Sequence, residues 1–427
     1  MLTSLGASDS LTQGTILTMY DPDRSQNVQK LGDPSSWSAF LEQARQNLIE
    51  SGGKGFRILS ETVTSPTLAD QMGRILKQFP AAKWHQYEPI NRDGVHDGTK
   101  LAFGEPLNPI YHFDKAEVIV SRDADFLNAP YPGNLRYARE FSDKRRLRTK
   151  DIKIQGEEGA ASKIEQPKNA QMNRLYAIES SYSITGAMAD HRLPVKASQI
   201  EGFAGHLAKA LGLSFTGAPE SASANDAVLK AMVSDLQANR GKALVIAGDQ
   251  QPGNVHALAA AMNDALGAIG STVSYTAPIE SNPVNQMESL KELCSDMKAG
   301  GVKILLILGG NPVFTAPPDL NFASLLKQTQ STIHLSLFDD ETSELCQWHL
   351  PDTHPLEAWS DTRAFDGTVS IVQPLIAPLY EGKSAHEVLS AFLSAPGETD
   401  AKALGIPNQL SQGRERKQRK RNLFLYR

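Results

Sequence analysis

Short apolar runs alternate with helix-forming segments along most of the chain, and this alternation limits the fold more than any other feature. Runs such as FRILS (56–60), ALVIAG (243–248) and ILLILG (304–309) are apolar enough to be buried strands. Amphipathic helices are predicted over 255–266 and 287–297, where apolar residues recur on one face. Strands that alternate with helices form parallel sheets covered on both faces. The pattern predicts an α/β fold with doubly wound, mostly parallel sheets.

The number of domains follows from the length and from one interruption of this pattern. A chain of 427 residues is too long for one ordinary core. The stretch from about 143 to 173 is polar and charged, without clear periodicity. The predicted order is an N-terminal α/β lobe with an extended entry segment (1–150), a polar linker (151–174), a second Rossmann-like α/β lobe (175–345), a return segment that packs on the lobes (346–396) and a basic tail that is expected to be disordered (397–427).

The cysteine count excludes several classes of site. Only Cys294 and Cys346 occur, whereas an iron–sulfur cluster or a four-cysteine zinc site takes four thiolates. A disulfide framework is likewise excluded as the basis of the fold. No stretch approaches the roughly 20 apolar residues of a membrane helix. The first ten residues, MLTSLGASDS, lack the features of an export signal, so we expect neither a membrane span nor a signal in this chain.

Charge is distributed unevenly along the chain. The last seventeen residues carry seven Lys or Arg against one Glu, a net of +6, so the rest of the chain carries −11 out of the total of −5. An acidic body binds polyanions poorly, which argues against nucleic acid as a partner. A short basic run is more often a solvated terminus than a nucleic-acid patch.

Two glycine-bearing loops follow predicted strands and supply the candidate binding residues. Ligands of doubly wound sheets bind beyond the carboxyl ends of strands, and glycine lets the backbone approach them closely. The first loop follows the predicted strand 243–248. The helix after it carries His256 and Asn263, which are seven residues apart and therefore lie on nearly the same face. The alternative is that both loops are plain turns and that the amide at 263 satisfies a neighbouring loop. The candidates are Gly248, Asp249, Gln250, His256, Asn263, Gly309, Gly310, Asn311 and Pro312.

Two further clusters are weighed against ordinary structural roles. Potential metal ligands crowd into twelve residues, but Leu350-Pro351 prevents a regular helix from presenting both histidines, so a loop with satisfied polar groups is favoured. Asp190-His191 could form a catalytic pair, yet adjacent residues rarely face each other, so a structural or interface role is favoured. The crowded ligands are Cys346, His349, Asp352, His354 and Glu357.

Several stretches together resemble the molybdopterin oxidoreductases (the dimethyl sulfoxide reductase superfamily). More specifically, they resemble one branch, the large molybdopterin-like/iron–sulfur subunit of bacterial alternative complex III, a quinol:electron acceptor oxidoreductase. The resemblance extends from about Leu5 to Phe392, and TGAMADHRLP (185–194) is its most specific part. The stretches that carry it are 21–25, 102–127, 179–204, 254–273, 309–317 and 350–380.

The resemblance implies a subunit of a respiratory electron-transport complex on the periplasmic face of the bacterial inner membrane. The implied partners are an iron–sulfur ferredoxin-like part, membrane quinol-binding subunits and cytochrome c subunits. The ferredoxin-like part is absent from this sequence, so the chain is expected to be a fragment, with its iron–sulfur clusters outside it. Electrons would then pass through the partners, and the chain is not expected to be catalytic by itself.

The resemblance implies that the pterin cofactor has been lost in this branch, and departures from the cofactor-bearing relatives fit that loss. Asp123 and Asp125 lie where a pyrophosphate would need N–H donors. Glu357 is kept, but Ser360-Asp361 replaces a glycine–threonine pair, and no molybdenum-ligating Cys or Ser is identified by spacing. The glycine loops are therefore interpreted as vestigial pterin loops, with no cofactor or metal in this chain. The alternatives are an active molybdopterin-dependent oxidoreductase whose loops still hold the pterin nucleotide, and a soluble α/β protein that binds a small anion in the same crevice.

Overall fold

The computed structural model describes residues 3–146, 172–214 and 226–393. All but the last residues of the predicted linker, and the whole of the predicted basic tail, lie outside these ranges. Within them, no helix is long and apolar enough to cross a membrane.

The chain forms two compact units that are not sequential. Unit 1 comprises Met1–Gly14, Ile90–Ile279 and Ala364–Thr368, and unit 2 comprises Thr15–Pro89, Glu280–Arg363 and Val369–Arg427. The division differs from the predicted lobes, 1–150 and 175–345, because strands from the two ends of the chain share one sheet. Ile58 in β3 (Phe56–Ser60) pairs in parallel with Leu306 in β11 (Ile304–Leu308). Local periodicity contains no information on such pairing.

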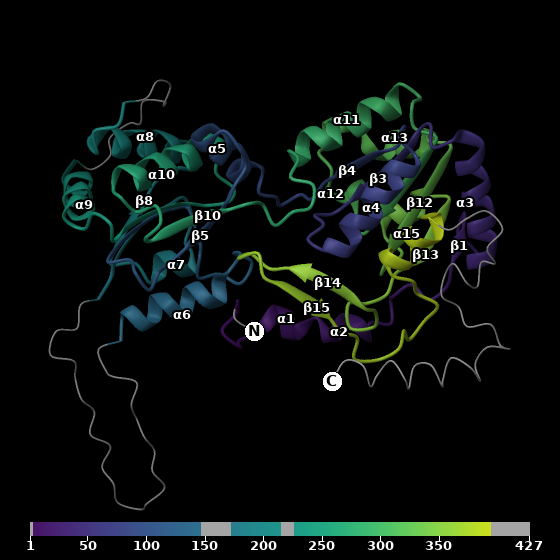
Figure 1. Cartoon of the computed structure of the whole chain (residues 1–427), viewed down its shortest axis with the longest axis horizontal. Coiled ribbons are helices and arrows are strands. Elements are labelled where there is room, and N and C mark those ends of the chain that lie inside the picture. Colours follow the sequence, from purple (N-terminus) through teal and green to yellow (C-terminus); the bar gives the residue numbers. More distant parts are fainter. Residues whose placement is uncertain (1–2, 147–171, 215–225, 394–427) are drawn as a thin grey trace, which may run out of the picture. The chain divides into compact units, whose positions relative to one another are not determined.

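Unit 1 is built on a four-stranded parallel sheet in the order β8-β7-β6-β9 (Figure 1). Alternate residues of β6 point into two separate cores: Val118 and Val120 join helices α8, α9 and α10, whereas Ile119 packs with α6. A two-stranded antiparallel sheet, β10-β5, lies beside these layers in the same unit. The strands are β5 (Asn108–Tyr111), β6 (Val118–Arg122), β7 (Arg174–Glu179), β8 (His191–Pro194), β9 (Ala243–Ala247) and β10 (Val273–Thr276). The helices are α1 (Ser10–Gly14), α5 (Asp93–Phe103), α6 (Asn134–Lys144), α7 (Ile184–Ala187), α8 (Ile200–Ala210), α9 (Asp226–Ala238) and α10 (Gly253–Ala265).

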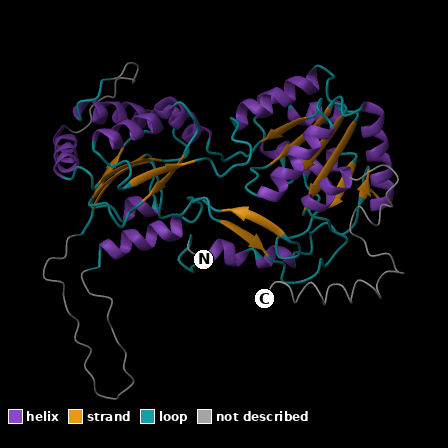
Figure 2. Cartoon of the chain, in the orientation of Figure 1, coloured by secondary structure: helices purple, strands orange, loops and turns teal. Residues whose placement is uncertain are grey.

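Unit 2 is built on a seven-stranded sheet in the order β2-β1-β13-β12-β11-β3-β4. The five strands β13, β12, β11, β3 and β4 are parallel to one another. At the other edge, β1 pairs antiparallel with both β13 and β2. Leu306 and Leu308 face α3, α4 and α15, whereas Leu305 and Ile307 face α11 and α13. Both faces of the sheet are therefore covered by helices, as Figure 2 shows.

The elements of unit 2 begin with α2 (Ile16–Met19), β1 (Gln29–Lys30), β2 (Asp33–Pro34), α3 (Trp37–Ser51), α4 (Pro66–Gln78) and β4 (Lys83–Gln86). They continue with α11 (Gln286–Lys298), α12 (Pro312–Thr315), α13 (Phe322–Gln328), β12 (Ser331–Ser336), α14 (Glu341–Leu345), β13 (Trp348–Pro351), a hairpin of β14 (Ser360–Arg363) and β15 (Val369–Val372), and α15 (Ala385–Leu393). The predicted α/β class, with parallel sheets between helices, is confirmed.

Candidate functional site

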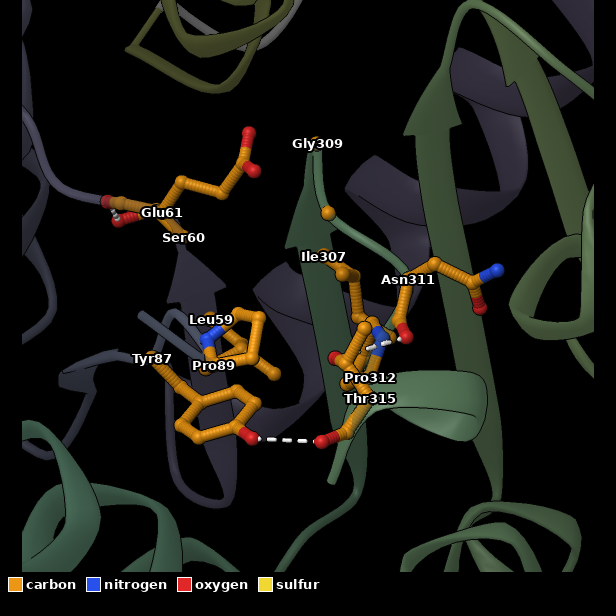
Figure 3. Close-up of a pocket in the computed structure, with 11 residues that line it drawn as sticks. Leu59, Ser60, Glu61, Tyr87, Pro89, Ile307, Gly309, Asn311, Pro312 and Thr315 are labelled. Carbon is orange, nitrogen blue, oxygen red and sulfur yellow. Dashed lines mark hydrogen bonds between the residues drawn. The ribbon is translucent and has the colours of Figure 1, made fainter. Parts of the chain in front are cut away.

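A pocket opens in unit 2 where β3 and β11 end. It consists of two adjoining cavities of about 130 and 250 Å³, and both are lined by Ser60, Glu61 and Gly309. The smaller cavity is shown in Figure 3, where the Tyr87 hydroxyl donates a hydrogen bond of 2.7 Å to the Thr315 carbonyl at its base. The predicted loop Gly309-Gly310-Asn311-Pro312 lines this cavity, so it lies at the edge of the sheet where ligands of such folds bind.

The two glycines of this loop adopt left-handed backbone conformations. Their φ angles are +68° at Gly309 and +66° at Gly310, which side-chain-bearing residues rarely adopt. The Gly309 N–H donates to the Leu335 carbonyl (2.9 Å), and the buried His334 ring contacts the Gly310 carbonyl through Nε2 (3.0 Å). Burial lowers the pKa of His334 to about 4, so this ring is neutral at physiological pH. Hydrogen bonds to Leu335 and His334 of the neighbouring strand β12 therefore hold the loop in a fixed shape.

The space above the glycines is taken by a carboxylate of the chain itself. A Cβ at Gly309 would lie 2.6 Å from Oε2 of Glu61, and one at Gly310 would lie 3.3 Å from its Cγ. Figure 3 shows the Glu61 side chain directed toward Gly309. The pocket walls, and then Glu88, raise the pKa of Glu61, while the Gly310 N–H partly offsets them. A carboxyl group of the chain itself therefore occupies the place where this loop would have to accept an anion.

Asn311 and Pro312 serve the adjoining helices. The Asn311 amide donates to Glu341 (2.6 Å), and its oxygen accepts from the Thr342 hydroxyl (2.7 Å) at the start of α14. Pro312 is the first residue of α12, a position that suits its fixed φ. The polar atoms of Asn311 are thus directed to α14 and away from Glu61 (Figure 3).

The larger cavity is acidic, since Asp352 and Asp361 line it together with Glu61. Burial raises the pKa of Asp352 to about 7, although the Thr353 N–H partly offsets this. Burial also acts on Asp361, but hydrogen bonds from Ser65 and Thr67 outweigh it and lower the pKa of that carboxyl. The two aspartates therefore differ in charge near neutral pH, and Asp352 is suited to take up or release a proton.

Asp352→Asn should make the protein more stable relative to wild type as the pH rises from about 5 to 8. The folded-state pKa of Asp352, about 7, lies above the unfolded value. Its contribution to stability is therefore present at low pH and lost as the pH rises through 7. Urea unfolding between pH 4 and 8 measures the difference. Asp361→Asn is the matched control with the opposite sign, because its pKa is lowered. Parallel pH profiles for Asp352→Asn and wild type would contradict this assignment.

The second predicted loop lies in unit 1 and packs around Asp123. A Cβ at Gly248 would lie 2.1 Å from the Asp123 carbonyl oxygen, and the Gln250 amide donates to the same oxygen (2.7 Å). The Asp123 carboxylate accepts hydrogen bonds from the Ser180 N–H (2.9 Å) and the Gln251 amide (3.0 Å). Here too a carboxylate of the chain uses the donors at the carboxyl end of the sheet.

The other candidates of unit 1 have separate partners. Asp249 lies 3.5 Å from the guanidinium of Arg92. Asn263 uses its amide to pair with both the N–H and the carbonyl of Val245 (2.9 and 2.8 Å), which completes the edge strand β9. His256 is buried, and burial, Arg122 and Arg92 lower its pKa to about 3. The candidates therefore form two groups, one in each unit, and Asn263 has a structural role.

The crowded ligands after residue 345 are also engaged separately. His349 contacts the hydroxyls of Ser25 (2.5 Å) and Ser343 (2.8 Å) through its two ring nitrogens. Glu357 pairs with Arg24, and burial raises the pKa of Cys346 to about 12. Over the described ranges, no three His, Cys, Asp or Glu side chains are grouped as metal ligands.

Asp190 and His191 do not form a pair. Asp190 accepts hydrogen bonds from Arg145 and from the Leu175 N–H (2.8 Å), while the His191 ring stacks on Tyr176 with centroids 4.7 Å apart.

Sequence reasoning did not find Glu61, although a signal was present. Glu61 directly follows the predicted strand 56–60, as Gly309 directly follows the strand 304–308. Residues at that position of neighbouring parallel strands meet at one edge. Finding Glu61 required knowing that β3 and β11 are neighbours, which only the structure gives.

Comparisons with known proteins identify the fold. No family model matches the chain, and no curated protein matches it significantly in sequence. Its structure is similar to acetylene hydratase from Pelobacter acetylenicus, with a TM-score of 0.60 and 12% identity over 92% of this chain and 63% of that one. It is also similar to a chain of the formyltransferase/hydrolase complex from Methylorubrum extorquens in complex with methylofuran, with a TM-score of 0.53 and 14% identity over 88% of this chain and 99% of that one.

Identities this low establish the fold alone, and the chain spans less than two thirds of acetylene hydratase. The protein has a mixed α/β fold of the molybdopterin oxidoreductase type, with helices covering parallel sheets.

Proposed function

We propose that the chain is a molybdopterin oxidoreductase-like subunit of a respiratory quinol-oxidising complex of the alternative complex III type. In this role it is a cofactor-free scaffold for the iron–sulfur electron-transfer part. The fold supports the relation to the molybdopterin oxidoreductases. The resemblance of the stretch around TGAMADHRLP (185–194) to the large subunit of alternative complex III supports the assignment to that type of complex.

The arrangement at the glycine loops is the observation that carries the cofactor-free role. A pterin nucleotide presents a pyrophosphate, which needs free N–H donors and a positive or neutral surface. Glu61 lies over Gly309 and Gly310, and Asp123 occupies the Ser180 N–H and the Gln251 amide. At each loop a pyrophosphate would therefore meet a carboxyl group of the chain in place of free N–H donors. These residues do not fit the cofactor, so no chemical step is assigned to it.

The segment around the short helix α7 of unit 1 exposes apolar side chains that a partner would cover. Tyr182 is 90% exposed, Ile184 54% and Met188 49%, all within or beside the short helix α7. The segment is well fixed, because Glu179 binds both Arg192 and Ser183, and Arg192 lies 4.1 Å from the Tyr182 ring centroid. Fixed, exposed aromatic and methionine side chains are favoured at protein interfaces.

We therefore assign this α7 surface to the contact with the iron–sulfur ferredoxin-like part. The membrane quinol-binding and cytochrome c subunits would complete the complex on the periplasmic side of the inner membrane. Electrons would pass through these partners and not through the chain itself.

Co-purification with the ferredoxin-like part tests the proposal. The double variant Tyr182→Ser/Met188→Ser should reduce recovery of that part by about tenfold or more, because the loss of a tyrosine that acts as an interface hot spot costs about 2 kcal/mol or more. Leu101→Ser, which alters an exposed apolar side chain on α5 of the same unit, is the matched control. Leu101→Ser should recover as much of the ferredoxin-like part as the wild type does. The melting temperatures of the double variant and of Leu101→Ser should both equal that of the wild type. Equal recovery with the double variant would remove the proposed contact.

A further inference from the structure

The larger cavity of unit 2, of about 250 Å³, combines an apolar wall with acidic and hydroxyl side chains. Among the described residues that line this cavity and the smaller one beside it, there is no Lys, Arg or His. The apolar wall is formed by Val63, Leu68, Leu308, Leu335 and Ala385, and the hydroxyl-bearing residues are Ser60, Thr62, Thr64 and Ser65. A pocket of this kind encloses the apolar part of a small molecule and orients it through a few polar groups.

Asp352, directly after β13, presents a carboxyl oxygen to this cavity. Its Oδ1 accepts the Thr353 N–H (2.7 Å), and within the described ranges its Oδ2 has no hydrogen-bond partner. Burial is the largest influence on this carboxyl, so it lies deep in unit 2, yet the residue is only half-buried because it lines the cavity. The Oδ2 atom can therefore accept a hydrogen bond from a molecule in the cavity.

The charges around Asp352 favour a cation from outside the chain. Besides burial, three charged side chains act on the pKa of Asp352: Arg24 lowers it, whereas Glu387 and Glu61 raise it. Arg24 is the cation among these, and its two hydrogen bonds to the Glu357 carboxylate commit it to that partner. A cation that enters the cavity would stabilise the charged form of Asp352.

We propose that this cavity binds a small organic cation, a primary ammonium group on a short alkyl chain, whose N–H groups donate to Asp352 while the chain lies against the apolar wall. Asp361 lines the same cavity, and its lowered pKa keeps it a carboxylate at neutral pH. An ammonium carries three donors, so it suits more than one acceptor. A metal ion is disfavoured, because across the described ranges no three potential ligands are grouped.

The inference goes beyond the proposed scaffold role, which assigns no ligand to this cavity. It rests on that role only in that the glycine loop holds no pterin. A protein that contains no pterin and binds no amine would overturn the inference and leave the scaffold role intact.

Isothermal titration calorimetry of the full chain with propylammonium chloride, at constant ionic strength, tests the site. We expect one saturable site per chain, with an affinity about tenfold higher at pH 8 than at pH 6. That factor is the ratio of the ionised fractions of Asp352 at the two pH values for a pKa of about 7. At pH 7 binding should release about half a proton, which is measured by comparing the heats in phosphate and HEPES buffers.

Asp352→Asn should bind propylammonium about tenfold more weakly than wild type at pH 8, without pH dependence or proton release. The variant should fold, because it removes a charge that burial disfavours. Asp319→Asn, which alters an exposed carboxyl of unit 2 outside the cavity, is the matched control and should bind as wild type does.

Three results would overturn the inference. One is the absence of saturable heat with wild type at pH 8, and another is an affinity that is equal at pH 6 and pH 8 or unchanged in Asp352→Asn. The third is saturable binding of magnesium chloride by a protein that does not bind propylammonium, since the cavity would then be a metal site.

Discussion

Arg24→Met should lower the free energy of unfolding of unit 2 by about 3–5 kcal/mol, the usual cost of leaving one partner of a buried ion pair alone. Arg24 and Glu357 form two hydrogen bonds, of 2.8 and 3.2 Å, and each side chain is 1% exposed. Glu357 also accepts the N–H groups of His354 and Leu379, so it organises the segment that follows β13. Urea unfolding monitored by tryptophan fluorescence measures the change.

The double variant Arg24→Met/Glu357→Met is the control for this pair. Replacing both members with apolar side chains removes the uncompensated charge, so it should recover most of the loss. Arg24 and two backbone N–H groups outweigh burial and lower the pKa of Glu357. The pair therefore contributes stability above the unfolded pKa of a glutamate, and this contribution is lost as the pH falls through the folded value. Equal stability of Arg24→Met and wild type at pH 7 would show that the pair does not hold the segment.

Gly248→Ala should destabilise unit 1 by about 3 kcal/mol, at the upper end of the usual cost of overpacking, because the new Cβ is forced into backbone atoms. It would lie 2.1 Å from the carbonyl oxygen of Asp123. That residue cannot easily move, since its N–H donates to Ile178 (2.7 Å) and its carboxylate accepts from Ser180. Thermal melting followed by circular dichroism measures the loss.

Gly73→Ala is the matched control for Gly248→Ala. Gly73 lies inside α4, with open space around its Cα, so alanine there should stabilise the helix by about 0.5–1 kcal/mol. Wild-type stability of Gly248→Ala would contradict the close packing of this loop. If that variant had also lost binding of a nucleotide, the loop would be a binding loop, as in the rival hypothesis of an active molybdopterin enzyme.

The α/β class could be predicted from the sequence because its signal is local. Runs such as 304–308 are apolar at every position, and β11 is buried at every position. The cap of α4 is also a local feature: the Ser65 hydroxyl accepts a hydrogen bond from the N–H of Leu68, three residues later (3.0 Å). Features set by neighbouring residues are recorded in the neighbouring sequence.

The pairing of strands could not be predicted, and the composition of the site depends on it. The sequence identified Gly309 and Gly310, but the carboxylate they accommodate belongs to Glu61, which comes from the other end of the chain. Arg24 and Glu357 also come from distant stretches, 21–25 and 350–380, that the family resemblance had singled out separately. Only the sheet order of unit 2 brings such residues together.

Elemental analysis of the full chain, produced in a host that synthesises molybdopterin, tests most directly whether Glu61 and Asp123 exclude the cofactor. We expect molybdenum and tungsten far below one atom per chain, and no pterin fluorescence after oxidative denaturation. The matched sample is the double variant Glu61→Gln/Asp123→Asn, which separates the effect of the two charges from that of loop shape. One molybdenum or tungsten atom per wild-type chain, released together with a pterin, would contradict the scaffold role and favour an active enzyme.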